Sequence, residues 1–131
     1  KIKGLPISWK GGKAVAPTTT MGGTYTRATG QAPFLLAKGF TDAESRIDKN
    51  AVYNFVTTND IIGGNSGSPL VDRKGEVVGL IFDGNLDSLV LDFLYSNQRA
   101  RAISVDARAI IEALRNVYDC SALADEIQKG Q

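Results

Sequence analysis

The chain has no histidine among its 131 residues. Histidine is the side chain that most often takes the proton from a serine or cysteine nucleophile. Chemistry that needs such a base therefore depends on a histidine from outside this chain. The sequence also begins with Lys1 rather than Met and shows no signal peptide. From these absences we expect the chain to be a piece of a longer protein.

Cysteine is almost absent as well, with Cys120 as the single example. One cysteine cannot form an internal disulfide bond, so the fold has to be stabilised by packing. Reactive cysteines are usually activated by a neighbouring positive group, and there is no histidine here to act in that way. We therefore expect Cys120 to be a half-buried small residue between two helices.

The charges are balanced, and no basic cluster is present. The chain has 15 Lys and Arg residues against 14 Asp and Glu residues, which gives a net charge of +1. Nucleic-acid binding depends on clustered Lys and Arg, so nucleic acid is not an expected partner. The longest apolar runs, such as Val77 to Phe82, are far too short to span a bilayer. Nothing in the sequence implies a metal ion or a cofactor.

The first half of the chain mixes predicted strands with one short helix, within a length that suits a single domain. Glycine-bounded, β-prone stretches lie at 15–20 and 23–27. The segment Thr41-Asp-Ala-Glu44 has the form of a capping box, which predicts a short helix reaching about Lys49. Residues 51–58 are rich in Val, Tyr, Phe and Thr and predict a strand.

The second half begins with a predicted β-hairpin at 69–82, with Gly75 in the turn where a positive φ is needed. Residues 83–99 form a long connection, which in a compact domain is often functional. A short strand is predicted at 102–105.

Two helices are predicted to follow, one capped by Asp106 and one by Ser121. Each helix carries an apolar stripe, which favours a face turned to the core over a face for a partner. The stripes consist of Ile110, Ile111, Leu114, Val117 and Tyr118 in the first helix, and Leu123 and Ile127 in the second.

The most informative stretch is the glycine-rich loop Gly63-Gly-Asn-Ser-Gly-Ser-Pro69. A serine nucleophile has to project from a tight loop whose small neighbours let a scissile carbonyl approach its Oγ atom. The same turn directs two backbone N–H groups to one spot and so forms an oxyanion hole. In this loop Ser66 is the candidate nucleophile, and the amides of Gly64 and Ser66 are the candidate oxyanion donors. A mere glycine-rich turn is the alternative.

The surroundings of the loop favour the catalytic interpretation. A predicted strand precedes it, and Pro69 leads into a hairpin of the form Leu-Val-x-x-x-Gly-x-x-x-Gly, which resembles the surroundings of the serine in trypsin-type enzymes. Two positions depart from that pattern, because Asn65 stands where Asp is usual and Ser68 where glycine is common. In secreted trypsins the Asp pairs with a new N-terminus, so Asn65 indicates that no such activation step is needed.

A closer resemblance covers most of the chain. The segments Thr57 to Val71 and Gly75 to Asn85 resemble the bacterial dipeptidyl peptidase 7 and 11 family, serine peptidase family 46. Val15 to Arg27 resembles the upstream segment of that family, and Arg101 to Arg115 resembles its closing strand and helix. The core motif is long enough to make the resemblance specific.

The resemblance implies a fold that is mainly β, part of a chymotrypsin-like double β-barrel (its C-terminal barrel) with C-terminal α-helices. Residues 1–131 would be the C-terminal portion of the catalytic domain that carries the nucleophile loop. Members of the family have a large inserted helical domain, and their catalytic His and Asp lie in the N-terminal part. We therefore expect the isolated chain to be inactive, because nothing in it can take the proton of Ser66.

The resemblance also assigns roles to two residues after the hairpin. Asp83 matches a residue that helps to hold the α-amino group of the substrate, and a carboxylate is the natural partner for an ammonium. Gly84 matches a position that lines the S1 pocket, which receives the side chain before the cut bond. Members with Arg at this position prefer Asp or Glu there, and members with Gly accept apolar residues. An ordinary turn acid and an ordinary turn glycine are the alternatives, and Asn85 receives no role.

Three other polar residues are candidates with lesser roles. Asp60, in the loop before the serine, is expected to cap loop amides. Lys74 and Lys38 are conceivable bases for a Ser–Lys pair. Lys74 lies in a predicted hairpin turn where its amine should be solvated and protonated, and we discount both lysines.

The implied activity is the release of dipeptides from free N-termini through an acyl-enzyme on Ser66, with an apolar or uncharged residue before the cut. The implied partners are such peptides and the N-terminal part of the same catalytic domain, with a homodimer in a Gram-negative periplasm or at the cell surface. Two alternatives stay open. One is a trypsin-fold endopeptidase that needs no free N-terminus, and the other is a non-enzymatic trypsin-fold binding module, against which the intact serine loop argues.

Overall fold

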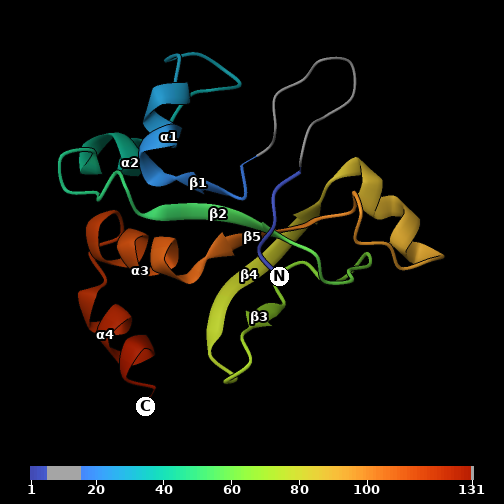
Figure 1. Ribbon diagram of the computed structural model, residues 1–131. Helices are drawn as coiled ribbons and strands as arrows, with labels where there is room; N and C mark the ends of the chain where they lie inside the picture. The colour runs from blue at the N-terminus through green and yellow to red at the C-terminus, as the bar shows by residue number, and fades with distance from the viewer. Residues whose placement is uncertain (6–15, 131) are drawn as a thin grey trace.

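The computed structural model describes residues 1–5 and 16–130. A five-stranded antiparallel sheet forms its centre, in the order β1-β2-β5-β4-β3 (Figure 1). Strands β1 and β3 are its edges, so the sheet is open within the described residues. The strands are β1 Thr18–Thr20, β2 Val52–Thr57, β3 Pro69–Val71, β4 Val77–Gly84 and β5 Ala102–Asp106. An antiparallel sheet followed by C-terminal helices confirms the predicted fold class.

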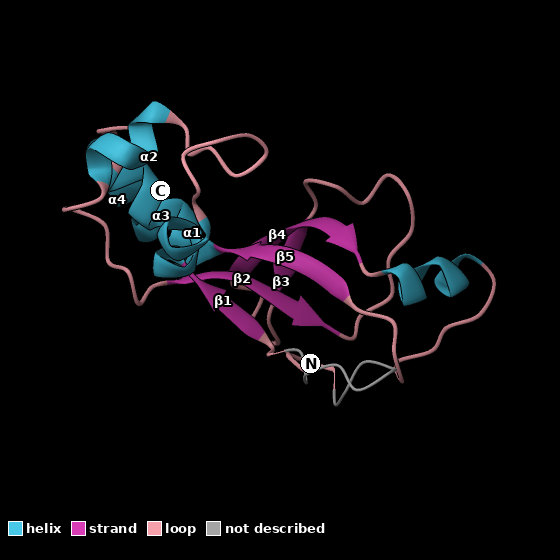
Figure 2. Ribbon diagram, turned by 90° about the horizontal axis from the view of Figure 1, so that it is seen from above, coloured by secondary structure: helices cyan, strands magenta, loops and turns pink. Residues whose placement is uncertain are grey.

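The helices are divided between the two ends of the sheet. Helices α1 to α4 gather at one end, and the 3₁₀ helix η1 lies beyond the other (Figure 2). The helices are α1 Met21–Arg27, α2 Lys38–Ala43, η1 Leu86–Asp92, α3 Ala107–Asn116 and α4 Ser121–Lys129. Within residues 1–5 and 16–130, every helix is too short or too polar to cross a lipid bilayer.

The hairpin of β3 and β4 and the closing strand–helix pair have the form that the sequence predicts. Gly75 adopts a φ of +84° in the hairpin turn. The carboxylate of Asp72 closes that turn by accepting bonds from the amides of Lys74 (2.7 Å) and Glu76 (3.1 Å). Asp106 caps α3 by accepting a bond from the amide of Arg108 at 2.9 Å.

The strand predictions for the first half are only partly correct. Residues 23–27 are not a strand but belong to α1, because Thr20 caps the helix through the amide of Gly23 and Met21 is buried in the core. Tertiary packing there overrides the β preference of the threonines. In the predicted stretch 15–20 only β1 is a strand, and Val15 lies outside the described residues.

The predicted capping box is also wrong. Helix α2 begins at Lys38 and ends at Ala43, and its N-cap, Ala37, makes no side-chain bond. The hydroxyl of Thr41 donates back to the carbonyl of Ala37 at 3.5 Å, which places Thr41 inside the helix. Residues 44–46 continue as a turn, and the helix does not reach Lys49.

At the C-terminus the second helix is placed correctly, but its environment differs from the prediction. Cys120, not Ser121, is the N-cap of α4, and Cys120 is exposed rather than half-buried. In α4 only Ala124 is buried, whereas Leu123 and Ile127 are exposed. The apolar stripe of this short helix therefore does not face the core of the described residues. Tyr118, at the end of the first stripe, is exposed as well.

Candidate active site

The predicted serine loop connects β2 with β3 and has the tight backbone that the glycines suggest. Gly64 and Gly67 adopt φ values of +99° and +87°, in the region that favours glycine. Between them, the Asn65 side-chain oxygen accepts a bond from the amide of Ile62 at 2.8 Å. The backbone of Asn65 pairs with Ile62 and with the amide of Ser68. Asn65 therefore closes the loop locally.

Two further bonds attach the loop to the central sheet. The amide of Gly67 donates to the carbonyl of Ile81 at 2.7 Å, and the amide of Ile81 donates to the carbonyl of Ser68 at 3.0 Å. Within the described part of the chain, the amides of Gly64 and Ser66 donate to no protein acceptor. Both predicted oxyanion donors therefore keep their hydrogen-bonding capacity.

The side chain of Ser66 is exposed at this loop. Its Oγ atom lies 3.4 Å from the carbonyl oxygen of Phe82, at the outer limit of a hydrogen bond. Nothing crowds Gly63, Gly64 or Gly67, because a Cβ atom added to any of them would meet no atom within 4 Å. The hydroxyl is therefore accessible to a substrate.

A cavity of about 270 Å³ lies beside Ser66, between the serine loop, the end of β4 and the helix η1. It brings together three of the predicted site residues, Ser66, Asp83 and Gly84. Gly64 is not part of the wall, although Gly63 and Asn65 on either side of it are. The other lining residues are Ile61, Ile62, Ile81, Phe82, Ser88, Leu89 and Asp92.

The end of β4 is irregular at the point where it enters this cavity. The pairing of β4 with β5 shifts between Ile81 and Asp83, which marks a bulge in the strand. As a result Phe82 and Asp83 are both exposed, whereas successive side chains of a regular strand point to opposite faces of the sheet. One carboxylate oxygen of Asp83 accepts a bond from the amide of Gly84 at 2.8 Å. Asp83 therefore presents a fixed, accessible carboxylate to the cavity.

Gly84 lines the cavity, but the space next to its Cα atom is not open. A Cβ atom built on Gly84 would lie 2.2 Å from the Ser88 hydroxyl oxygen and 2.7 Å from Cδ1 of Ile61. Real Cβ contacts are never this short, so any side chain at position 84 has to displace these neighbours. The position next to the Cα atom of Gly84 is therefore occupied by Ser88 and Ile61 and is not empty.

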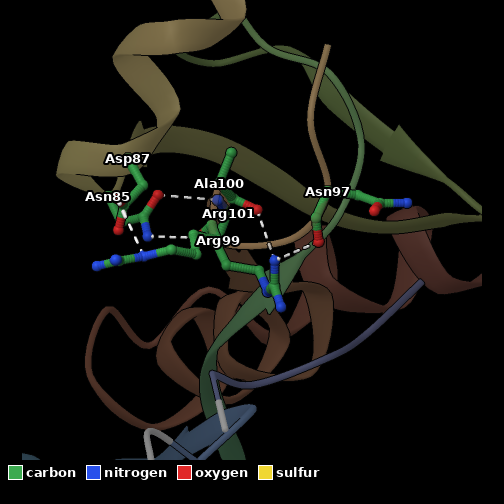
Figure 3. Close-up of polar contacts among 6 residues, drawn as sticks. All are labelled: Asn85, Asp87, Asn97, Arg99, Ala100 and Arg101. Atoms are coloured by element: carbon green, nitrogen blue, oxygen red, sulfur yellow. Dashed lines mark hydrogen bonds and ion pairs between the residues drawn. The ribbon is translucent and has the colours of Figure 1, made fainter. Parts of the chain in front are cut away.

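Asn85 fixes the end of β4 to the segment that precedes β5 (Figure 3). Its side-chain amide donates to the carbonyl of Arg99 at 2.8 Å, and its side-chain oxygen accepts from the amide of Arg101 at 2.8 Å. The amide of Asn85 also donates to the carbonyl of Arg101 at 3.1 Å. An ion pair of 3.3 Å between Asp87 and Arg99 adds a weaker link.

Arg101 anchors this network from inside the protein. It is only 1% exposed, and its guanidinium group donates to four backbone carbonyls. Those carbonyls belong to Lys3, Gly4, Asn97 and Ala100, at distances of 2.7–3.0 Å. A buried charge is stable only when its donors are satisfied, and the fork of five N–H groups suits this arrangement. Arg101 thus ties the N-terminal segment to the segment that precedes β5.

The other polar candidates lie outside this arrangement. The carboxylate of Asp60 accepts no hydrogen bond from a described residue, so the predicted capping role is not seen. Lys74 is exposed in the hairpin turn, as predicted. Lys38 forms an ion pair with Asp42 on α2, at the opposite end of the sheet from the serine loop.

Solved structures with the same fold cover nearly the whole chain. The match to DPP11 of Porphyromonas endodontalis in complex with the dipeptide Arg-Asp has a TM-score of 0.82 and 26% sequence identity, over 97% of this chain and 19% of that chain. The same protein in complex with Arg-Glu matches with a TM-score of 0.81 over the same shares. The fold is thus that of the corresponding segment in a dipeptidyl peptidase.

The sequence comparisons agree with the structural ones. A dipeptidyl-peptidase 7 of Phocaeicola vulgatus is 45% identical over 56% of this chain and 10% of the relative. A dipeptidyl-peptidase 7 of Capnocytophaga gingivalis is 34% identical over 75% of this chain and 15% of the relative. An Asp/Glu-specific dipeptidyl-peptidase of Porphyromonas endodontalis is 37% identical over 62% of this chain and 11% of the relative. The chain therefore spans about a tenth to a fifth of the length of the proteins it matches.

The sequence model of the family Peptidase S46 matches residues 1–129 of this chain. The chain belongs to this family.

Proposed function

We propose that this chain carries the nucleophile and part of the substrate pocket of a serine-type dipeptidyl peptidase. The observation that carries the proposal is the single cavity that gathers Ser66, Asp83 and Gly84. The Peptidase S46 match and the printed names of the relatives support it.

In the proposed reaction the Oγ atom of Ser66 attacks the carbonyl carbon of the second peptide bond. A histidine from outside this chain takes the hydroxyl proton and then gives it to the leaving amine. The amides of Gly64 and Ser66 bind the oxyanion of the tetrahedral intermediate, and the loss of one such donor costs about 2.7–4 kcal/mol. Water then cleaves the acyl-enzyme on Ser66 and releases the dipeptide. The isolated chain, which has no histidine, is proposed to be inactive.

The restriction to dipeptides is assigned to Asp83. Asp83 lines the cavity at the bulged end of β4, and among the described residues its carboxylate accepts one bond, from the amide of Gly84. A free α-amino group is a cation, and a charge-assisted bond to Asp83 would place the second peptide bond beside Ser66. The endopeptidase alternative requires no such contact.

The residue before the cut is proposed to be apolar or uncharged. Among the cavity-lining residues none is Lys or Arg, whereas Asp83 and Asp92 are acidic. A carboxylate on the substrate side chain would lose its hydration in the cavity without gaining a cationic partner. The carboxylates of Asp83 and Asp92 would also repel it. Ile61, Ile81 and Leu89 favour an apolar side chain instead. The named relatives include both dipeptidyl-peptidase 7 and Asp/Glu-specific enzymes, so the lining residues carry this part of the proposal.

The proposed partners are peptides with free N-termini and the N-terminal part of the same catalytic domain. A homodimer, and a periplasmic or cell-surface location in a Gram-negative bacterium, remain predictions from the family resemblance.

The role of Asp83 is tested by Asp83→Ala in the full-length protein, with matched free and N-acetylated peptides. A hydrogen bond to a charged group contributes about 1.5–3 kcal/mol, so kcat/KM for the free peptide should fall at least about tenfold. The matched control is Asp60→Ala, which removes an exposed carboxylate outside the cavity. An equal loss on the acetylated peptide would make Asp83 structural, and efficient cleavage of that peptide by the parent would favour the endopeptidase.

A further inference from the structure

One side chain that no motif pointed to stands directly beside Gly84. Ser88 lies in the first turn of η1, is half-buried and forms part of the cavity wall. Its hydroxyl oxygen is 2.2 Å, and its Cβ atom 3.0 Å, from the place that a Cβ atom on Gly84 would take. The position that the Cβ atom of a side chain at 84 would take is therefore already occupied, by Ser88 and by the tip of Ile61.

The backbone of Ser88 is held in this position. Its amide donates to the carbonyl of Asn85 at 2.8 Å. Asn85 is in turn bonded through both side-chain atoms to Arg99 and Arg101, and the guanidinium of Arg101 is buried (Figure 3). A side chain at position 88 is thus presented from a fixed point of the wall, so its size sets the shape of the cavity at this place.

We propose that Ser88 is a second specificity-determining residue, which sets the size of the S1 pocket jointly with Gly84. This inference rests on the proposed function, because it assumes that the cavity receives the side chain before the cut bond. The hydroxymethyl group of Ser88 narrows the pocket beside Gly84. A larger group at position 88 excludes bulky substrate side chains, and a smaller one admits them.

The proposal also predicts coupling between positions 84 and 88. An arginine at position 84 has to displace the hydroxyl of Ser88 and the tip of Ile61 before it can enter the pocket. Replacement of Ser88 by glycine removes both of the Ser88 atoms that lie within 3.0 Å of the new Cβ position. The effect of Gly84→Arg on specificity should therefore depend on which residue occupies position 88.

The first experiment uses the full-length protein and a panel of fluorogenic dipeptidyl substrates that differ only in the residue before the cut: Ala, Leu, Met, Phe, Asp, Glu and Lys. Ser88→Gly should raise kcat/KM for Phe relative to Ala about tenfold, and Ser88→Val should lower the same ratio about tenfold, since small volume changes in an apolar pocket have effects of this order. Ser96→Gly is the matched control, because Ser96 lies in the same connection but outside this cavity.

The second experiment is a cycle of Gly84→Arg, Ser88→Gly and the double variant. The measured quantity is the ratio of kcat/KM for cleavage after Asp to kcat/KM for cleavage after Leu. In the double variant this ratio should be about tenfold higher than the value obtained by combining the changes in the two single variants. Ser88→Ala keeps the Cβ atom, so combined with Gly84→Arg it should give a ratio between those of Gly84→Arg alone and of the double variant with glycine. It also provides a test of the proposal if the glycine variant folds poorly.

Unchanged substrate order in Ser88→Gly and Ser88→Val, with normal activity, would overturn the proposal. So would purely additive effects in the cycle. If the parent releases no dipeptides at all, the proposed function fails instead, and the two failures are therefore distinguishable.

Discussion

The helix-covered end of the sheet and the end that carries the serine loop are stabilised in different ways. At the helical end, apolar side chains from three elements and a turn form the core: Met21, Ala43, Ile47 and Ala109. At the serine-loop end, polar side chains bond to backbone groups, through Asn65 in the loop and through Asn85 and Arg101 beside the cavity. Hydrogen bonds are directional, whereas apolar burial is not. Directional bonds such as that of Tyr25 to the carbonyl of Phe40 occur at the helical end too, but there they accompany an apolar core, whereas at the serine-loop end they hold the cavity and its surroundings.

The largest expected effect is the loss of peptidase activity, without loss of stability, when the candidate nucleophile is removed. Ser66→Ala in the full-length protein should reduce peptidase activity on the order of 10⁴-fold or more, because it removes the nucleophile. The fold should be unaffected, since the side chain is exposed and makes one long hydrogen bond. Ser45→Ala, at an exposed serine of the helical end, should be fully active. Near-normal turnover of Ser66→Ala would exclude Ser66 as the nucleophile.

A pair of core variants tests whether the two ends are stabilised independently. Arg101→Met leaves four backbone carbonyls without this donor, and an unpaired buried acceptor such as the carbonyl of Ala100 costs about 1–3 kcal/mol. The free energy of local opening at residues 97–101 should therefore fall by at least about 2 kcal/mol, and amide hydrogen exchange there should be correspondingly faster. Met21→Ala should cost about 2–5 kcal/mol and accelerate exchange in α1 and α2.

The substrate preferences of the two variants should differ too. Arg101→Met should alter the order of preference in the dipeptide panel, since Asn85 and Ser88 are tied to it, whereas Met21→Ala should preserve that order. Acceleration spread evenly over both ends in both variants would show that the sheet opens as one unit.

The smallest effect concerns pH at the helical end. Burial raises the pKa of Tyr25 above its ordinary value of 10.0, with a further rise from the Glu44 carboxylate that the Lys49 ammonium opposes. Its hydroxyl donates to the carbonyl of Phe40 at 2.8 Å. The native state therefore holds this proton more tightly than the unfolded state, and the stabilisation is complete below the ordinary pKa.

Stability should fall as pH rises through the higher pKa of the folded state. Thermal unfolding between about pH 9 and 11 checks this, with Tyr25→Phe as the comparison. The parent should lose stability more steeply than the variant. Equal slopes would show that Tyr25 does not contribute.

Local signals made much of the site predictable. The glycines around Ser66, the turn at Gly75 and the cap at Asp106 are each specified by a few adjacent residues, and these predictions agree with the structure. Features that depend on distant contacts were not predictable. The local sequence at 23–27 favours a strand, but these residues form part of α1, whose Met21 packs against partners far along the chain.

The remaining features of the site required the three-dimensional arrangement. The bulge that exposes Phe82 and Asp83 is defined only by pairing with β5. The sequence predicts only a long connection at 83–99, and no local signal indicates the helix η1 or the position of Ser88 beside Gly84. Arg101 is a charged residue directly before β5, and a charged side chain normally indicates exposure. Only its four carbonyl partners explain its burial.

The most direct test of the central claim is fluorophosphonate labelling, followed by mapping of the adduct by mass spectrometry. The full-length protein and the isolated 131-residue chain are treated side by side, with Ser66→Ala as the blank. The account predicts a single stoichiometric adduct on Ser66 in the full-length protein and none in the isolated chain, because a serine without a base is a weak nucleophile. An adduct on a different serine of the full-length protein, or stoichiometric labelling of Ser66 in the isolated chain, would contradict the account.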